Sequence, residues 1–128
     1  MKKRALLIIG AGGHGCVVAE IATELGYGNI AFLDDNSESA IGKINDMDKF
    51  KDDYRNAFCA IGNNVVRAQL LDRLESAGYA LPSLIHPTAY LSKSAEIESG
   101  VVIEPGAIVN TGAHIHKGAI ISVGAIVD

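Results

Sequence analysis

Residues 85–128 read IHPTAY LSKSAE IESGVV IEPGAI VNTGAH IHKGAI ISVGAI VD when they are written in groups of six. The first place of each group is always aliphatic, and the fifth place is always Ala or, once, Val. A period of six fits neither the 3.6-residue turn of an α-helix nor the two-residue alternation of a strand. It is typical of a parallel β-helix, in which each hexapeptide forms one side of a triangular coil. The stretch therefore predicts a short solenoid of a little over two coils.

The repeat also predicts where its side chains point. The aliphatic first residue should face the core of the coil, and the small fifth residue should let the chain pack behind it. Glycine occupies the fourth place from Gly100 onward, which suits a backbone turn with positive φ. The predicted core positions are Ile85, Leu91, Ile97, Ile103, Val109, Ile115, Ile121 and Val127.

The residues before the repeat have a different rhythm, in which short apolar runs alternate with helical patterns. Strands are predicted over 5–9, 30–33, 57–61 and 81–84, and a helix follows the first and the third of these. Asn64 is the expected N-cap of the second helix. This alternation predicts a small Rossmann-like parallel α/β sheet over residues 1–84, followed by the hexapeptide β-helix over 85–128.

Composition narrows the function classes. The chain has 128 residues and a net charge of -4, with no cluster of Lys and Arg, so we expect no nucleic-acid partner. The apolar run after the basic start is too short for a signal peptide, and no window is long enough to span a bilayer. We therefore expect a cytoplasmic protein without membrane insertion. Cys16 and Cys59 lack metal-binding spacing and are expected to be buried thiols.

A glycine-rich motif follows the first predicted strand. Gly10, Gly12 and Gly15 satisfy G-x-G-x-x-G at the start of a helix, where backbone N–H groups and the helix dipole favour a phosphate. Asp34 and Asp35 end the second predicted strand, at the sheet edge where such folds bind ligands. The motif is compatible with a sugar nucleotide, a dinucleotide or a tight turn alone. The small sheet and the repeat module, which offers no hydride-transfer site, disfavour NAD.

The order of four short motifs in front of the hexapeptides resembles the sialic acid O-acetyltransferase family, which includes the UDP-amino-sugar N-acetyltransferases of the bacillosamine pathway. The motifs are GAGGHG (10–15), FLDD (32–35), AIGNN (60–64) and LIHP (84–87). The resemblance implies a left-handed β-helix acetyltransferase that uses acetyl-CoA on a UDP-linked amino sugar or a sialic acid. It also implies a homotrimer with acetyl-CoA between neighbouring β-helices, and no metal.

The resemblance assigns the nucleotide sugar to the N-terminal sheet edge. Each candidate there also has a structural alternative: a cap or an exposed imidazole for His14, and turn chemistry for the paired Asp residues. The predicted substrate-binding residues are Gly12, Gly13, His14, Asp34, Asp35, Gly62 and Asn63.

No catalytic residue is assigned within the chain. The family's histidine base comes directly after a stretch that corresponds here to residues 122–128, so it would follow Asp128. We therefore expect the chain as given to bind a nucleotide sugar without acetyl transfer, and its open β-helix end to fray or self-associate. The alternatives are a non-catalytic nucleotide-sugar-binding or assembly module and, less favoured, an NAD-linked enzyme.

The remaining polar residues receive structural interpretations. His114 and His116 should point out of the coil; no third ligand is evident, so no metal site is predicted. His86 is expected to fix the junction between the two halves. The glutamates Glu96, Glu98 and Glu104 are expected to face solvent.

Overall fold

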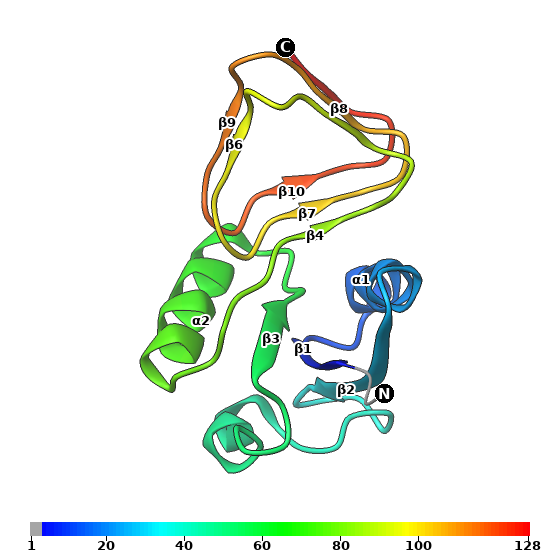
Figure 1. The fold of residues 1–128 in the computed structure, drawn as a ribbon. Helices are drawn as coiled ribbons and strands as arrows, with labels where there is room; N and C mark the ends of the chain where they lie inside the picture. The colour runs from blue at the N-terminus through cyan, green and yellow to red at the C-terminus, as the bar shows by residue number, and fades with distance from the viewer. Residues whose placement is uncertain (1–3) are drawn as a thin grey trace.

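The computed structural model describes residues 4–128, and its N-terminal part is a three-layer α/β unit (Figure 1). Three parallel strands pair in the order β2 (Tyr27–Leu33), β1 (Arg4–Ile9) and β3 (Asn56–Cys59). One face of this sheet is covered by α1 (Gly13–Glu24). The other face is covered by α2 (Asn64–Ser76) and a short 3-10 helix, η1 (Ile44–Lys49).

The central strand β1 is apolar along its length because both of its faces are covered. Leu6 and Ile8 pack toward α1, whereas Leu7 and Ile9 pack toward α2, and all four side chains are fully buried. A strand buried on both sides needs consecutive apolar residues rather than an alternating pattern. The apolar run that predicted a buried parallel strand is therefore explained.

The fourth sheet strand predicted over 81–84 is wrong. Ala80 makes a single bridge to Asn56, and the sheet has three strands among the described residues. Pro82 has no N–H to give to a ladder. Leu84 instead begins β4 (Leu84–Ile85), which pairs with Val102 in the following part of the chain.

The C-terminal part is a triangular β-helix made of two-residue strands, seen end-on in Figure 1. One side contains β4, β7 and β10; the second contains β5, β8 and β11; the third contains β6 and β9. The strands after β4 are β5 (Tyr90–Leu91), β6 (Glu96–Ile97), β7 (Val102–Ile103), β8 (Ile108–Val109), β9 (His114–Ile115), β10 (Ile120–Ile121) and β11 (Ile126–Val127).

The register confirms that three hexapeptides make one coil. Each strand from β4 to β8 pairs in parallel with the strand 18 residues later, as in Tyr90 with Ile108. All eight predicted aliphatic positions belong to one cluster inside the triangle, with Ile103 and Val109 fully buried. The glycines at the fourth place all have φ between 68° and 74°, as the turn requires.

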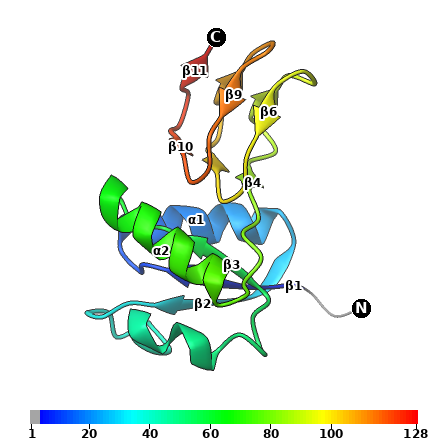
Figure 2. The same ribbon diagram turned by 90° about the vertical axis from the view of Figure 1, so that its left-hand side faces the viewer.

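The β-helix rests on the α/β unit through its β4, β7 and β10 side (Figure 2). Leu84 and Val102 on that side belong to the same apolar cluster as α1 and one face of the sheet. His86 lies at this junction as predicted: its Nε2 is 2.6 Å from Glu24 Oε2 at the end of α1. The backbone N–H of Thr88 donates to His86 Nδ1, so the Nε2–H is the group that donates to Glu24.

Candidate functional site

The predicted site residues lie on the three loops that follow β1, β2 and β3. Because the strands are parallel, these loops meet at one edge of the sheet, where open α/β folds bind ligands. Both helices begin at this edge, and the β-helix closes over it. Arg67 in α2 donates from Nε to the carbonyl of Gly118 in the β-helix, 2.9 Å away.

Two glycines of the first loop are required by packing. Gly10 has φ +103°, and a Cβ there would lie 2.9 Å from the carbonyl oxygen of Ala60. A Cβ on Gly15 would overlap the carbonyl oxygen of Gly10, because the first turn of α1 touches the end of β1. Both residues therefore shape the loop itself and need no ligand to explain them.

Three other glycines have no such structural reason. A Cβ on Gly12, Gly13 or Gly62 would meet no heavy atom within 4 Å. Gly12 has φ -79° and ψ -162°, an extended conformation that any residue adopts. Neither backbone strain nor internal packing calls for glycine at these places; Gly12 and Gly13 lie at the start of α1, and Gly62 lies directly before α2. Exposed backbone N–H groups of a helix N-terminus are suited to an anion.

One ring nitrogen of His14 has an unusual environment. Its Nε2 is buried and makes no hydrogen bond to any described residue. Burial lowers the pKa of His14, Glu104 partly offsets this, and Arg67 lowers it further. The imidazole is therefore neutral at pH 7, with one buried ring nitrogen available to donate or accept.

Asp34 and Asp35 hold the loops together. Asp34 Oδ2 accepts from the N–H of Ala11 and its Oδ1 from the N–H of Asn36, each at 2.8 Å. The Ala11 hydrogen bond is the main reason that the pKa of Asp34 lies below its usual value. Asp35 Oδ1 accepts from the N–H of Ile44 at 3.0 Å. Both carboxylate oxygens of Asp34 are thus used, one in its own turn and one in a bond to the loop after β1, whereas Asp35 remains exposed at the loop.

The second helix begins one residue earlier than expected. Asn63, not Asn64, is the N-cap of α2, and its Oδ1 accepts from the N–H of Val66 at 3.0 Å. Asn64 is the first helical residue, and its Oδ1 accepts from Arg67 at 2.8 Å. Gly62, directly before the cap, keeps the open position described above.

Two polar residues at this edge were not predicted. Arg67 donates to the carbonyls of Ile61 and Gly62 as well as to Gly118, so it joins α2, the loop after β3 and the β-helix. A positively charged side chain is disfavoured near the N-terminus of a helix. The occurrence of Arg67 near the start of the second predicted helix was therefore the sequence signal that could have pointed to this residue. Glu104 is only 7 % exposed, so the expectation that it faces solvent is wrong. Its charge acts on His14, so it lies near that residue, which the repeat alone does not predict.

The two cysteines also differ from expectation in part. Cys59 is buried in β3, but Cys16 is exposed on α1.

A separate surface hollow of about 390 Å³ lies at α2 and η1, lined by Met47, Asp48, Asp72, Arg73, Ser76 and Ala77. None of the predicted site residues lines it. Over residues 4–128, no helix is both long and apolar enough to cross a membrane.

The sequence profile of the PglD N-terminal domain family matches residues 5–74, which include the sheet, both helices and all three loops. This match covers more than half of the chain. The chain belongs to this family. The family match stops short of the β-helix, so the similarity of that part is seen in the comparison with individual proteins.

One curated relative is the UDP-N-acetylbacillosamine N-acetyltransferase of Bacillus subtilis (strain 168). It is 35% identical over 106 residues, which cover 74% of this chain and 49% of the relative. The chain therefore spans about half the length of the curated relative that it matches.

Solved structures share both parts of the fold. The acetyltransferase domain of PglB from Neisseria gonorrhoeae FA1090, in complex with acetyl coenzyme A, superposes with a TM-score of 0.91 at 40% identity. The match covers 99% of this chain and 65% of that one. PerB from Caulobacter crescentus, in complex with CoA and GDP-perosamine, gives a TM-score of 0.88 at 30% identity, covering 100% and 65%.

Proposed function

We propose that the chain forms the sugar-nucleotide-binding part of an acetyl-CoA-dependent N-acetyltransferase that acts on a nucleotide-linked amino sugar. The observation that carries this proposal is the combination of two features at one sheet edge. One is a set of glycines that no internal contact requires, Gly12, Gly13 and Gly62. The other is the buried, unpartnered Nε2 of His14 beside them. The UDP-N-acetylbacillosamine N-acetyltransferase of Bacillus subtilis and the complex of PerB with GDP-perosamine supply the substrate class.

The diphosphate of the sugar nucleotide is assigned to the loop at Gly12 and Gly13. Both residues lie at the start of α1, and a Cβ at either one would meet open space. Anions bind helix N-termini because these N–H groups have no partner within the helix. His14 is proposed to hydrogen-bond the substrate through Nε2, and the exposed Asp35 to face the nucleoside.

Acetyl-CoA enters the proposal as the second substrate. Complexes of the PglB domain and of PerB contain acetyl coenzyme A and CoA respectively, which supports this choice. The resemblance assigns the general base to a histidine that follows the position of Asp128, so no residue within 4–128 is proposed as the base. His14 is proposed to bind. The chemistry is a direct attack of the sugar amine on the thioester carbonyl: the amide C–N bond forms, the C–S bond breaks, CoA leaves and the base takes the amine proton.

Isothermal titration calorimetry tests the proposal. UDP-linked and GDP-linked 4-amino sugars are titrated separately into the chain, with NADH and acetyl-CoA as further ligands. We expect heat of binding with at least one sugar nucleotide and none with NADH. His14→Ala should weaken that binding about tenfold, because it removes one hydrogen bond from a buried site.

A matched control is Gln69→Ala, an exposed substitution on α2 that should leave the affinity unchanged. Binding of NADH in place of the sugar nucleotides would favour the dinucleotide interpretation and overturn the proposal. Equal affinities for the His14→Ala and Gln69→Ala variants would remove His14 from the site.

We also propose that copies of the chain associate through the β5, β8 and β11 side of the β-helix. Tyr90, Ile108 and Ile126 pair in register on that side and point outward, with exposures of 56%, 38% and 70%. Stacked apolar side chains on a solvent face mark an interaction surface. The homotrimer implied by the family resemblance would bury them.

Light scattering coupled to size-exclusion chromatography tests this association. Ile108→Glu should lower the measured mass toward that of one chain, because a charge would enter an apolar contact. Val65→Glu changes a residue that is also exposed, at 67%, but lies on α2, and it should leave the mass unchanged. A wild-type chain that is already monomeric at high concentration would contradict the proposal.

A further inference from the structure

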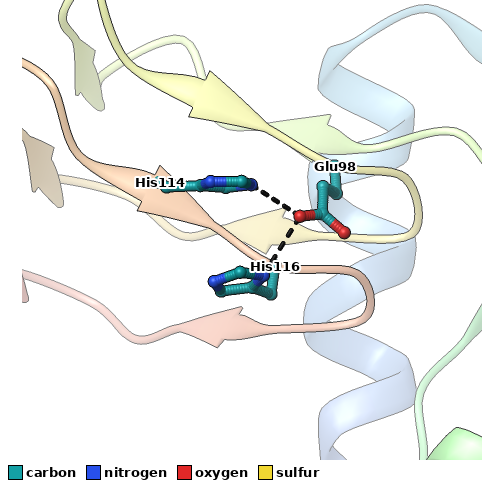
Figure 3. A group of neighbouring side chains, drawn as sticks. All are labelled: Glu98, His114 and His116. Atoms are coloured by element: carbon teal, nitrogen blue, oxygen red, sulfur yellow. Dashed lines mark hydrogen bonds and ion pairs between the residues drawn. The ribbon is translucent and has the colours of Figure 1, made fainter.

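The third side of the β-helix carries a cluster of polar side chains that the proposed function does not use. Glu98 follows β6, and His114 and His116 lie in and directly after β9 (Figure 3). The 18-residue coil places Glu98 beside His116 on neighbouring rungs, because Glu96 and His114 are paired in register. All three side chains point away from the core and are exposed by 40%, 44% and 77%.

Their ligand atoms converge on one point. Glu98 Oε2 lies 2.5 Å from His114 Nε2 and 3.1 Å from His116 Nδ1. The two imidazole rings are stacked with their centroids 4.3 Å apart and an angle of 15° between their planes. One ligand atom from each residue can be chosen so that all three lie within 4.8 Å of one another.

Two further groups lie next to this cluster. Glu96 Oε2 lies 3.6 Å from His114 Nδ1, on the far side of the ring from Glu98. Histidines that bind metal through one nitrogen usually present the other to a carboxylate, which sets the tautomer. The second oxygen of Glu98 accepts from the backbone N–H of Lys117 at 3.2 Å, and this bond holds the carboxylate in place.

We propose that Glu98, His114 and His116 form a site for a divalent transition-metal ion of the zinc type. Two imidazole nitrogens and one carboxylate oxygen are ligands that Zn²⁺ accepts, whereas Mg²⁺ and Ca²⁺ prefer oxygen ligands throughout. A tetrahedral Zn²⁺ with bonds of about 2.1 Å holds its ligand atoms about 3.4 Å apart. Binding requires the exposed rings of His114 and His116 to turn out of their stacked arrangement, because the ion must lie in the plane of each ring, and Glu98 Oε2 to move away from His114 Nε2; water completes the shell.

The sequence disfavoured a metal here because His114 and His116 have no third ligand nearby along the chain. That expectation did not take into account that the coil brings residues of successive turns together. Glu98 lies 16 residues before His114 in the sequence, yet the two side chains are hydrogen-bonded. A bound ion would join β6 to β9, the side of the triangle with two strands rather than three within residues 4–128. The site lies on a different side from Tyr90 and Ile108, so it is separate from the proposed association surface.

The test is calorimetric titration of Zn²⁺ into the untagged chain at pH 7.5 after removal of trace metal with a chelator. We expect one ion per chain. His114→Gln, His116→Gln and Glu98→Gln should each weaken Zn²⁺ binding about tenfold or more. The thermal midpoint should rise by about 5 °C at about ten times the dissociation constant of the ion. Co²⁺ should give the visible absorption of a tetrahedral site.

Two control variants separate this site from other ligands. Glu38→Gln removes an exposed carboxylate elsewhere, and Cys16→Ser removes the exposed thiol; both should bind Zn²⁺ as the wild type does. Circular dichroism checks that each variant is folded. Absence of binding, or binding that the three ligand substitutions leave unchanged, would overturn the proposal. So would loss of binding in Cys16→Ser alone.

Discussion

The carboxylate of Asp34 accepts a hydrogen bond from the backbone N–H of Ala11 at 2.8 Å, and so fastens the loop after β2 to the glycine-rich loop after β1. Its second oxygen accepts from Asn36. An aspartate that we predicted as a substrate ligand thus has a structural task, which is to hold the edge on which the proposed site depends.

Asp34→Asn should lower the free energy of unfolding by about 1 kcal/mol at pH 7, because a charge-assisted hydrogen bond to Ala11 is weakened. The pKa of Asp34 is lowered in the folded state, mainly by that bond. The unfolded chain therefore takes up the proton first, and this stabilisation is lost as the pH falls below about 4. Urea midpoints at pH 7, 5 and 3 measure the difference. Asp53→Asn, an exposed carboxylate without a described side-chain bond, is the control; equal pH slopes in all three proteins would contradict the assignment.

Gly15 and Gly13 lie two residues apart in α1 but should respond oppositely to alanine. Gly15→Ala places a methyl group on the carbonyl oxygen of Gly10 and should cost about 3 kcal/mol of stability. Gly13→Ala meets no neighbour and should keep the thermal midpoint, since alanine is favoured in helices. It should nevertheless weaken sugar-nucleotide binding, because the methyl group enters the space assigned to the diphosphate. If a folded Gly13→Ala protein binds the sugar nucleotide with unchanged affinity, the diphosphate does not lie at Gly13, and the glycine-rich motif is explained as a tight turn alone.

Cys16 and Cys59 should differ in their rate of reaction with a thiol reagent. Burial raises the pKa of Cys59 to about 11, and the thiolate is the reactive form. Cys16 is exposed on α1 and should be modified quickly at pH 8. We expect one fast thiol per folded chain and two after denaturation in guanidinium. Cys16→Ser should abolish the fast phase, and two fast thiols in the folded protein would contradict the burial of Cys59.

The hexapeptide part of the fold was predicted most completely, because its signal repeats. The first residue of every hexapeptide is aliphatic and faces inward, as Ile103 and Val109 do. Each further repeat therefore supports the same prediction. The segment between the two parts was predicted least well. Leu81 and Leu84 are apolar in either a fourth strand or a crossing to the β-helix, and only the tertiary pairing of Leu84 with Val102 decides between them.

The position of the candidate residues at one sheet edge could be predicted better than the contacts that each of them makes. Parallel strands bring their carboxyl ends together, so the loops at Gly12, Asp34 and Gly62 follow from topology alone. Whether a polar group is already used depends on contacts between segments far apart in the sequence. Asp34 already accepts a hydrogen bond from the N–H of Ala11, whereas His14 has a buried ring nitrogen without a hydrogen-bond partner. Local sequence patterns carry no information about such contacts.

Leu71 makes an apolar contact between α2 and the β-helix. Leu71 is 4% exposed and its Cδ1 lies against Gly118, where a Cβ would overlap it. Its Cδ2 would lie 3.3 Å from a Cβ on Gly100. Arg67, one turn earlier on the same helix, donates to the carbonyl of Gly118. The β-helix is therefore anchored to α2 at a glycine that has two reasons to remain glycine.

Gly118→Ala and Gly112→Ala separate those two reasons. Both glycines have φ near +74°, so alanine should bring about 1 kcal/mol of backbone strain to each. Only Gly118→Ala also meets Leu71, and it should lose about 2 kcal/mol more in urea unfolding. Leu71→Ala, costly by itself, should remove that extra loss, so the double variant should be less destabilised than the sum of the single variants. Equal losses for the two glycine variants would mean that the Leu71 side chain moves aside, and that its packing against Gly118 adds nothing to stability.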